Sequence, residues 1–567
     1  MRGFGNRKSV SIAGKAAVSH DYEVKNGNLL KSIYANGWEV AYTYDANDCL
    51  IKEVQTTPDG VRTVTRGYDA DSRETVVTCG SVKVEKTFDK LGRLLSIRRN
   101  GGKHTTTYTY GTAADGGQTG RIKTVKNGSG TWEYAYDAWG NVSKATENGS
   151  ADSHTYTYDA QGQLTREYDP DKKLYLGYQY DAGGNLTEVR SYPAGAEGGP
   201  EGTGTVLKTF AYGSTWKDQL ASVTMEGKTR NFTYDANGNL LSDGKYTYSW
   251  TKGSLLEKVT GDGLEAVYTY DASGIRTSKK VNGITTEYLT AGGSVLSEKK
   301  NGVWQHYLYD GSGQLTAIRY KGADYYYIRD GLMSITGLVD ANGTAVVNYR
   351  YDSWGMLTGI TGSMAGTLGK DNPYRFKGYY YDEETGMYYL KSRYYQPEIC
   401  RFISADTTDV LEIQEDLDDL NLYTYCNNNP INWEDPDGTI AIELGYVALT
   451  VLVFTYVYIA GVRRKKKTTR TYTVTKSYWN SHSHSNYLGN KIISFSAYTV
   501  TKWVSGKTKN SKGGKQNIKD SGLAGLSDAE VSRRAKDKSL SKKERDRYKK
   551  EEKARALRNK RKRKSHY

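Results

Sequence analysis

Three stretches of the chain repeat one pattern at a fixed interval: YAYDAWGNV at residues 134–142, YTYDAQGQL at 156–164 and YQYDAGGNL at 178–186. Alternating tyrosines place two rings on one face of a strand. The aspartate carboxylate can accept hydrogen bonds from backbone N–H groups of the following turn, and the glycine suits its left-handed position. Each unit therefore predicts a β-hairpin, and further copies begin at Tyr42, Phe232, Tyr268, Tyr307 and Tyr349.

The composition supports a long series of such hairpins, with 50 Tyr and 62 Gly but only 8 Pro. One hairpin is marginally stable alone, whereas stacked hairpins form a continuous sheet. This pattern resembles the YD repeats of the Rhs and teneurin families. The resemblance implies a mainly β fold in which the β-sheet of about residues 20–438 spirals into a hollow shell. We expect this shell to be monomeric.

A second signature ends this region. It comprises YYDEETGMYYL at 380–390, RYYQPEICRF at 393–402, NLYTYCNNNP at 421–430 and DPDG at 435–438. It resembles the Rhs-associated core domain, which implies that this segment closes the shell. The family's core can also act as an intramolecular aspartyl protease that cuts shortly after the closing DP-x-G. By the same resemblance, Arg393 and Asp406 stand at proposed protease positions.

The core departs from the family pattern where that chemistry matters. Gln396 replaces the usual Asp, Thr407 replaces a Pro, and Cys400 replaces the Gly of the GRF motif. An aspartyl protease needs two carboxylates that share a proton, and glutamine cannot titrate. We therefore predict that the chain stays largely intact after Gly438. Asp435 is equally well explained as a turn-forming aspartate.

The sequence changes character after the core. Residues 444–462, LGYVALTVLVFTYVYIAGV, contain no charged side chain. As a helix they would span about 28 Å, close to the thickness of a bilayer core. Two interpretations remain open: a membrane-inserting segment, or an apolar segment packed inside the shell.

The basic charge lies almost entirely in the last fifth of the chain. Residues 1–462 hold 47 Lys+Arg and 56 Asp+Glu, a net of −9, whereas residues 463–567 hold 32 and 8, a net of +24. We expect a few strands near residues 467–505 and two helices beginning at Ser527 and Ser541, hence a small mixed, partly α-helical tail. Its unpaired basic end predicts nonspecific phosphate binding. The binding residues would be Arg558, Lys560, Arg561, Lys562, Arg563 and Lys564.

These features predict five segments: a lead-in at 1–20, a repeat shell at 20–370, the core at 371–438, the apolar segment at 440–462 and a basic effector tail at 463–567. The leading hypothesis is an Rhs-type polymorphic toxin whose tail acts on nucleic acid in a competing cell, with an acidic immunity protein as its partner. If the tail is a nuclease, the candidate acid and base groups are His482, His484, Glu530 and His566.

Two other interpretations stay open: a non-enzymatic cell-surface adhesion scaffold with a transmembrane anchor, and an inert gene fragment. We expect a secreted or cell-surface protein, in contact with a membrane if residues 444–462 insert. The first residues lack the apolar core of a secretory signal. The four cysteines have no zinc-site spacing, so we expect neither metal nor cofactor.

Overall fold

The computed structural model describes residues 8–12, 15–112, 118–195, 199–406, 421–439 and 441–443, together with two short strands further along. The chain divides into two units, Met1–Lys466 and Lys467–Tyr567. In the second unit the described part is an antiparallel pair, β41 (Thr473–Lys476) with β42 (Ser496–Thr499).

Each repeat forms a hairpin through the bonds that its residue types predict. In the unit at Tyr158, Asp159 Oδ1 accepts hydrogen bonds from the backbone N–H groups of Gln161 and Gln163, at 3.0 and 2.9 Å. Gly162 takes the left-handed conformation with φ +82°. The Tyr158 hydroxyl donates to the Val142 carbonyl, at 2.7 Å, and so ties its hairpin to the preceding one. The same tyrosine bond recurs at Tyr68, Tyr110, Tyr136, Tyr180, Tyr212, Tyr270, Tyr309 and Tyr351.

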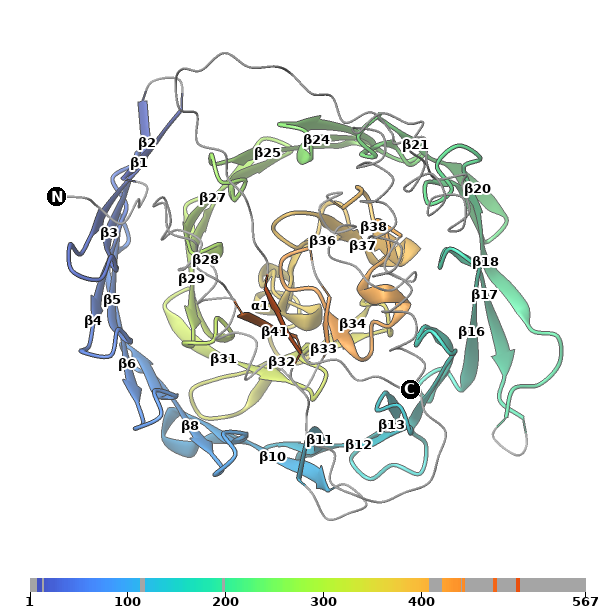
Figure 1. Cartoon of the computed structure of the whole chain (residues 1–567), viewed down its shortest axis with the longest axis horizontal. Helices are drawn as coiled ribbons and strands as arrows, with labels where there is room; N and C mark the ends of the chain where they lie inside the picture. The colour runs from blue at the N-terminus through green and yellow to red at the C-terminus, as the bar shows by residue number, and fades with distance from the viewer. Residues whose placement is uncertain are drawn as a thin grey trace, which may run out of the picture. The chain divides into compact units, whose positions relative to one another are not determined.

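The hairpins join into two long antiparallel sheets in which strands adjacent in sequence pair with each other. Among the described residues, the first sheet has 20 strands and the second has 14. The first runs from β1 (Ser9–Ile12) to β20 (Lys228–Asn231), and the second from β21 (Thr233–Tyr234) to β34 (Leu357–Thr361). Figure 1 shows the strands following one another round a ring. The predicted mainly β repeat shell is confirmed.

The second sheet lies inside the first over part of the ring, which makes the arrangement a spiral. In Figure 1, β27 (Ile284–Ala291) to β31 (Ala323–Arg329) lie within the arc of β3 (Leu29–Tyr34) to β8 (Val82–Phe88). Two buried clusters fill the space between the layers. Val40 packs with Leu289 in one, and Val77 with Leu308 in the other. Apolar burial between layers stabilises the winding.

The core segment occupies the interior of the ring (Figure 1). Three asparagines connect it to three successive YD turns of the first sheet. Asn428 Nδ2 donates to the Gly184 carbonyl and Asn429 Nδ2 to the Gly162 carbonyl, both at 2.7 Å, while Asn432 Oδ1 accepts from Val142 N at 2.7 Å. The core elements are α1 (Leu368–Asp371), β35 (Tyr380–Asp382), β36 (Met387–Tyr389), β37 (Tyr394–Gln396), β38 (Arg401–Phe402), β39 (Trp433–Glu434) and β40 (Ile442–Glu443).

Candidate functional site at the end of the core

Arg393 lies immediately before β37 and is the centre of a buried polar cluster. Its side chain is 7% exposed. Nη1 donates to the Leu422 carbonyl at 3.0 Å, and Nε donates to the Gly438 carbonyl. The guanidinium lies 3.7 Å from the centroid of the Phe402 ring, so one face of the cation rests on an aromatic surface. The last turn of the core is therefore bound directly to Arg393.

Two carboxylates converge on the same nitrogen of this guanidinium. Arg393 Nη2 lies 2.7 Å from Asp406 Oδ2 and 3.5 Å from Asp435 Oδ2. Burial raises the pKa of Asp435 to about 6, although Arg393 acts to lower it. Asp406 and Asp435 therefore face the same buried cation.

Asp435 also forms the predicted turn. Its Oδ1 accepts hydrogen bonds from the N–H groups of Gly438 and Thr439, at 2.8 and 3.0 Å. Ser392 fixes the same turn from the other side, because its N and Oγ both donate to the Asp437 carbonyl, at 3.1 and 2.6 Å. Asp435 therefore forms the turn through Oδ1 and contacts Arg393 through Oδ2.

Gln396, which stands where the family motif has an Asp, is not one of the two residues that pair with Arg393. It pairs with Arg401 across β37 and β38, and its buried Oε1 has no hydrogen-bond partner among the residues that the structure describes. The carboxylates on Arg393 come from Asp406 and Asp435. Cys400, where the family has glycine, adopts φ +59°. Burial raises the pKa of its thiol to about 12, so it is not a reactive thiolate.

The remaining predicted residues lie outside the described part of the chain. They are His482, His484, Glu530, His566, Arg558, Lys560, Arg561, Lys562, Arg563 and Lys564, together with the apolar segment 444–462. No helix within the described residues is long and apolar enough to cross a membrane. The described residues also contain no group of three or more His, Cys, Asp or Glu side chains that could hold a metal ion.

Sequence reasoning missed the residues of the shell that hold the core. Asp382 of the YYD motif forms buried ion pairs with Arg276 and Lys279 of β26 (Arg276–Val281), at 2.5 and 2.9 Å. A signal was present in the repeats themselves. The ninth position of the repeat is Leu or Val in seven of the eight copies, but it is Arg276 in the copy that begins at Tyr268.

The family model of the teneurin YD-shell matches residues 148–431, which is half of the chain. The chain belongs to the teneurin YD-shell family. Solved structures support the same fold for this YD-shell protein. It resembles a chain in the crystal structure of TcdB2-TccC3-Cdc42 with a TM-score of 0.59 and 18% identity, over 78% of this chain and 25% of that one. It also resembles a chain in the Photorhabdus luminescens Tc holotoxin pore, with a TM-score of 0.57 and 18% identity, over 76% and 24%.

Several curated proteins share part of this YD-shell sequence. The tRNA3(Ser)-specific nuclease WapA of Bacillus spizizenii is 37% identical over 241 residues, which is 41% of this chain and 10% of that protein. Toxin subunit YenC1 of Yersinia entomophaga is 35% identical over 127 residues, 22% and 12% respectively. Double-stranded DNA deaminase toxin A of Burkholderia cenocepacia is 29% identical over 118 residues, 20% and 7%. The matches therefore span about a tenth of these relatives' length.

Proposed function

We propose that this YD-shell protein is an Rhs-type polymorphic toxin whose shell carries a basic C-terminal effector that acts on nucleic acid. The observation that carries the proposal is the change of charge along one chain. Residues 1–462, which contain the shell, carry a net of −9, and residues 463–567 carry a net of +24. A polyanion is the natural partner of such a segment, and an acidic immunity protein would be its antagonist.

The relatives support the same assignment. WapA is named as a tRNA nuclease and the Burkholderia protein as a deaminase toxin of double-stranded DNA, so both act on nucleic acid. YenC1 is named as a toxin subunit. Sequence of this kind thus occurs in a nuclease, a deaminase toxin and a toxin subunit. Nuclease action of the tail is the specific form that we propose, with secretion or cell-surface delivery as its route.

We predict that inducible expression of residues 463–567 in a bacterial cytosol arrests growth. The physical reason is that a strongly basic segment binds intracellular nucleic acid. The measurement is culture density after induction, with tail accumulation followed by immunoblot. The matched control is the full chain truncated after Lys466, which should grow as the empty vector does. Normal growth of cells in which the tail accumulates would contradict the effector assignment.

We infer a second candidate function, self-cleavage after Gly438, from the contacts of Arg393. Arg393 Nε donates to the Gly438 carbonyl, which polarises the peptide bond to Thr439. Asp406 is held as an ion pair and can serve as the base for a water molecule, while Asp435, with its raised pKa, can donate a proton to the leaving nitrogen. These contacts of Arg393 support cleavage, whereas the sequence predicts an intact chain because Gln396 stands in place of a carboxylate.

An intact-mass time course of the purified full chain distinguishes the two predictions. If Asp435 is the acid, residues 439–567 should be released faster below about pH 6 than at pH 8, because Asp435 must be protonated. Asp435→Asn keeps the turn acceptor and should slow release by roughly a hundredfold or more. Gln396→Asp should leave the rate unchanged, because Gln396 pairs with Arg401 and is not one of the carboxylates on Arg393. A wild-type chain that stays intact throughout would assign the Arg393 cluster to structure alone.

A further inference from the structure

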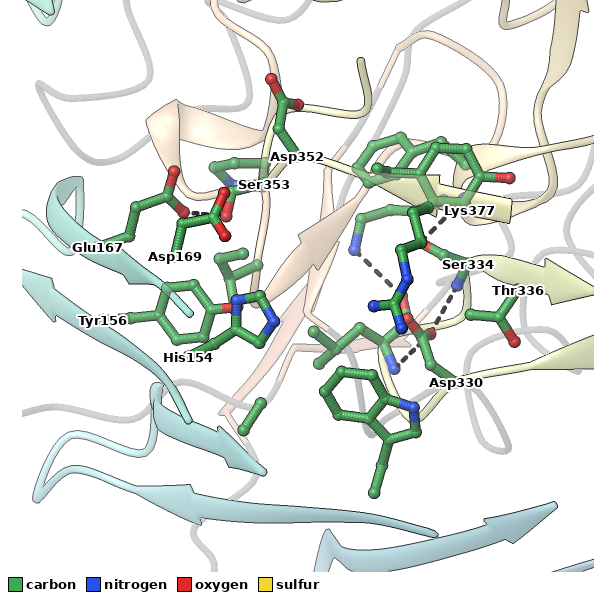
Figure 2. A pocket seen from close by; sticks show the side chains of 18 of the residues that line it. His154, Tyr156, Glu167, Asp169, Asp330, Ser334, Thr336, Asp352, Ser353 and Lys377 are labelled. Atoms are coloured by element: carbon green, nitrogen blue, oxygen red, sulfur yellow. Dashed lines mark hydrogen bonds between the residues drawn. The ribbon is translucent and has the colours of Figure 1, made fainter. Parts of the chain in front are cut away.

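A cavity of about 130 Å³ lies between the two sheets, and no residue of the Arg393 cluster lines it. One wall comes from the first sheet, β12 (Gly130–Tyr136) to β15 (Leu164–Asp169). The other comes from the second sheet, around β32 (Ile335–Val339) and β33 (Ala345–Tyr351). Figure 2 shows His154, Tyr156, Glu167 and Asp169 on one side, facing Asp330, Ser334 and Thr336 on the other.

The first wall is aromatic because of its strand register. Tyr134 of β12 and His154 of β14 (His154–Tyr158) both pair with Ala145 of the strand between them. The small Ala145 side chain leaves a hollow, and aromatic rings surround it. Trp132 stacks on Tyr134 with centroids 6.4 Å apart, and His154 stacks on Tyr156 at 6.4 Å with an interplanar angle of 6°. This wall presents ring faces over which a cation can lie.

The charges around the cavity are unbalanced. Five carboxylates line it, from Glu167, Asp169, Asp171, Asp330 and Asp352, but only Arg350 and Lys377 supply positive charge. Formally this leaves an excess of three negative charges among the lining residues, and Lys172, which pairs with Asp169 at 2.9 Å, reduces it to two. Arg350 is 55% exposed and pairs with Glu147 and Asp171, both at 3.3 Å. Lys377 Nζ donates to the Leu332 carbonyl at 3.2 Å, and its charge acts to lower the pKa of Asp330 against the larger effect of burial.

Asp330 and Asp352 each use one oxygen for a YD turn. Asp330 Oδ1 accepts from the N–H groups of Leu332 and Ser334, both at 2.9 Å. Asp352 Oδ1 accepts from Trp354 and Met356 in the same way, at 3.0 and 2.8 Å. Among the described residues, no donor occupies Oδ2 of either carboxylate. Of the two, Asp330 lies in Figure 2 on the wall that faces His154 and Tyr156, so its Oδ2 is the acceptor that we assign to a ligand.

We propose that this cavity binds an alkylammonium cation, either a free diamine or the ammonium group of a lysine side chain. The aromatic wall would contact the alkyl stem and the cation, and the unpaired carboxylate oxygens of the opposite wall would accept its N–H groups. A site of this kind goes beyond the proposed toxin function and does not rest on it.

The carboxyl groups of the cavity give cation binding a defined pH dependence. Burial raises the pKa of Glu167 to about 7 and that of Asp330 to about 6, and it also raises the pKa of Asp352. A bound cation stabilises the ionised carboxylates and so lowers these pKa values. Binding therefore releases protons, and affinity decreases as the pH falls through these values. Burial also lowers the pKa of His154 on the opposite wall.

The test is calorimetric titration of the full chain with putrescine at low salt. The neutral isostere 1,4-butanediol should give no binding. Asp330→Asn preserves the turn acceptor but removes the charge, and it should weaken putrescine binding by roughly tenfold or more. Asp340→Asn is the matched control, because Asp340 Oδ1 makes the same turn bonds to Asn342 N and Thr344 N, both at 2.9 Å, and does not line the cavity.

Further arms separate the possible outcomes. Asp352→Asn should also weaken binding, and wild-type affinity should be lower near pH 5.5 than near pH 8. Titration with Nα-acetyl-lysine amide identifies the source: binding of putrescine alone indicates a free diamine, and binding of both indicates a general alkylammonium site. If neither putrescine nor Nα-acetyl-lysine amide binds, the proposal is overturned. Equal affinity of the Asp330→Asn and Asp340→Asn variants overturns it as well, because the amine would then be held elsewhere on the acidic shell.

Discussion

Replacing Asp382 with asparagine is expected to lower the free energy of unfolding by about 3–5 kcal/mol. Asp382 is fully buried and accepts hydrogen bonds from Arg276 Nη1 and Nη2, at 2.5 and 3.0 Å, and from Lys279 Nζ at 2.9 Å. Asparagine has nearly the same shape but no charge. The substitution therefore leaves two buried cations with one carboxylate between them, that of Glu384.

The surroundings make this loss severe. Arg276 is enclosed by the rings of four tyrosines, with centroids 4.3–5.4 Å from the guanidinium carbon. Water has little access, so the unpaired charge cannot be hydrated. The cluster also joins β35 of the core to β26 of the shell. Loss of these ion pairs therefore weakens the contact between the core and the shell.

Guanidinium unfolding of the full chain, followed by circular dichroism and tyrosine fluorescence, measures the effect. Glu265→Gln is a suitable control, since Glu265 pairs with Lys258 at 2.7 Å on the exposed shell surface. That change should leave the unfolding midpoint where it is, because exposed ion pairs contribute little. An Asp382→Asn protein as stable as the wild type would show that the core is held mainly by other contacts.

The same cluster has a defined pH dependence. Burial alone would raise the pKa of Asp382, but Arg276 and Lys279 hold it below its usual value. A carboxylate with a depressed pKa stabilises the fold at pH values above its unfolded pKa. The contribution is therefore complete at neutral pH and is lost only as acid protonates the native carboxylate. Asp382→Asn and wild-type proteins should converge in stability at low pH.

Binding of nucleic acid by the tail is expected to weaken by roughly a thousandfold between about 50 and 200 mM salt, if about six phosphates are neutralised. Each phosphate contact releases a condensed counterion, so the loss grows with the number of contacts. The net of +24 in residues 463–567, with no base-reading motif such as a zinc finger, indicates contacts to phosphates rather than to bases. Sequence preference should accordingly be slight.

Fluorescence anisotropy titrations with labelled RNA and duplex DNA, across a salt series, test this expectation on the full chain and on residues 463–567. Truncation after Arg558 removes the five positive charges from Lys560 to Lys564. It should weaken binding to all nucleic acids alike and make the salt dependence less steep. A flat salt response, or no binding at low salt, would leave a membrane surface or an immunity protein to explain the charge.

The hairpin unit was predictable from sequence because its bonds are local. Asp159 reaches N–H groups two and four residues further on, and Tyr158 reaches a carbonyl only one strand away. Such contacts depend on residue type and spacing alone. The same holds for the turn at Asp435, whose Oδ1 binds N–H groups three and four residues on. Contacts between residues so close in the chain can be predicted from the sequence.

The second carboxylate on Arg393 was not predictable in this way. Motif comparison pointed to position 396, but the chain path of the core brings Asp435, 42 residues after Arg393, to the guanidinium instead. The ion pair of Arg276 with Asp382 joins positions 106 residues apart. In both cases the partner is decided by how strands from distant parts of the chain come to lie beside each other.

The sequence by itself determined the repeating hairpin, the mainly β shell, the core signature and the separation of charge between shell and tail. Only the tertiary structure decided what each copy of the repeat does. Asp330 and Asp340 make identical turns, yet Asp330 faces the cavity and Asp340 does not. The physical reason is that winding the sheet into a spiral gives chemically equal units different neighbours, and neighbours set burial, charge and access.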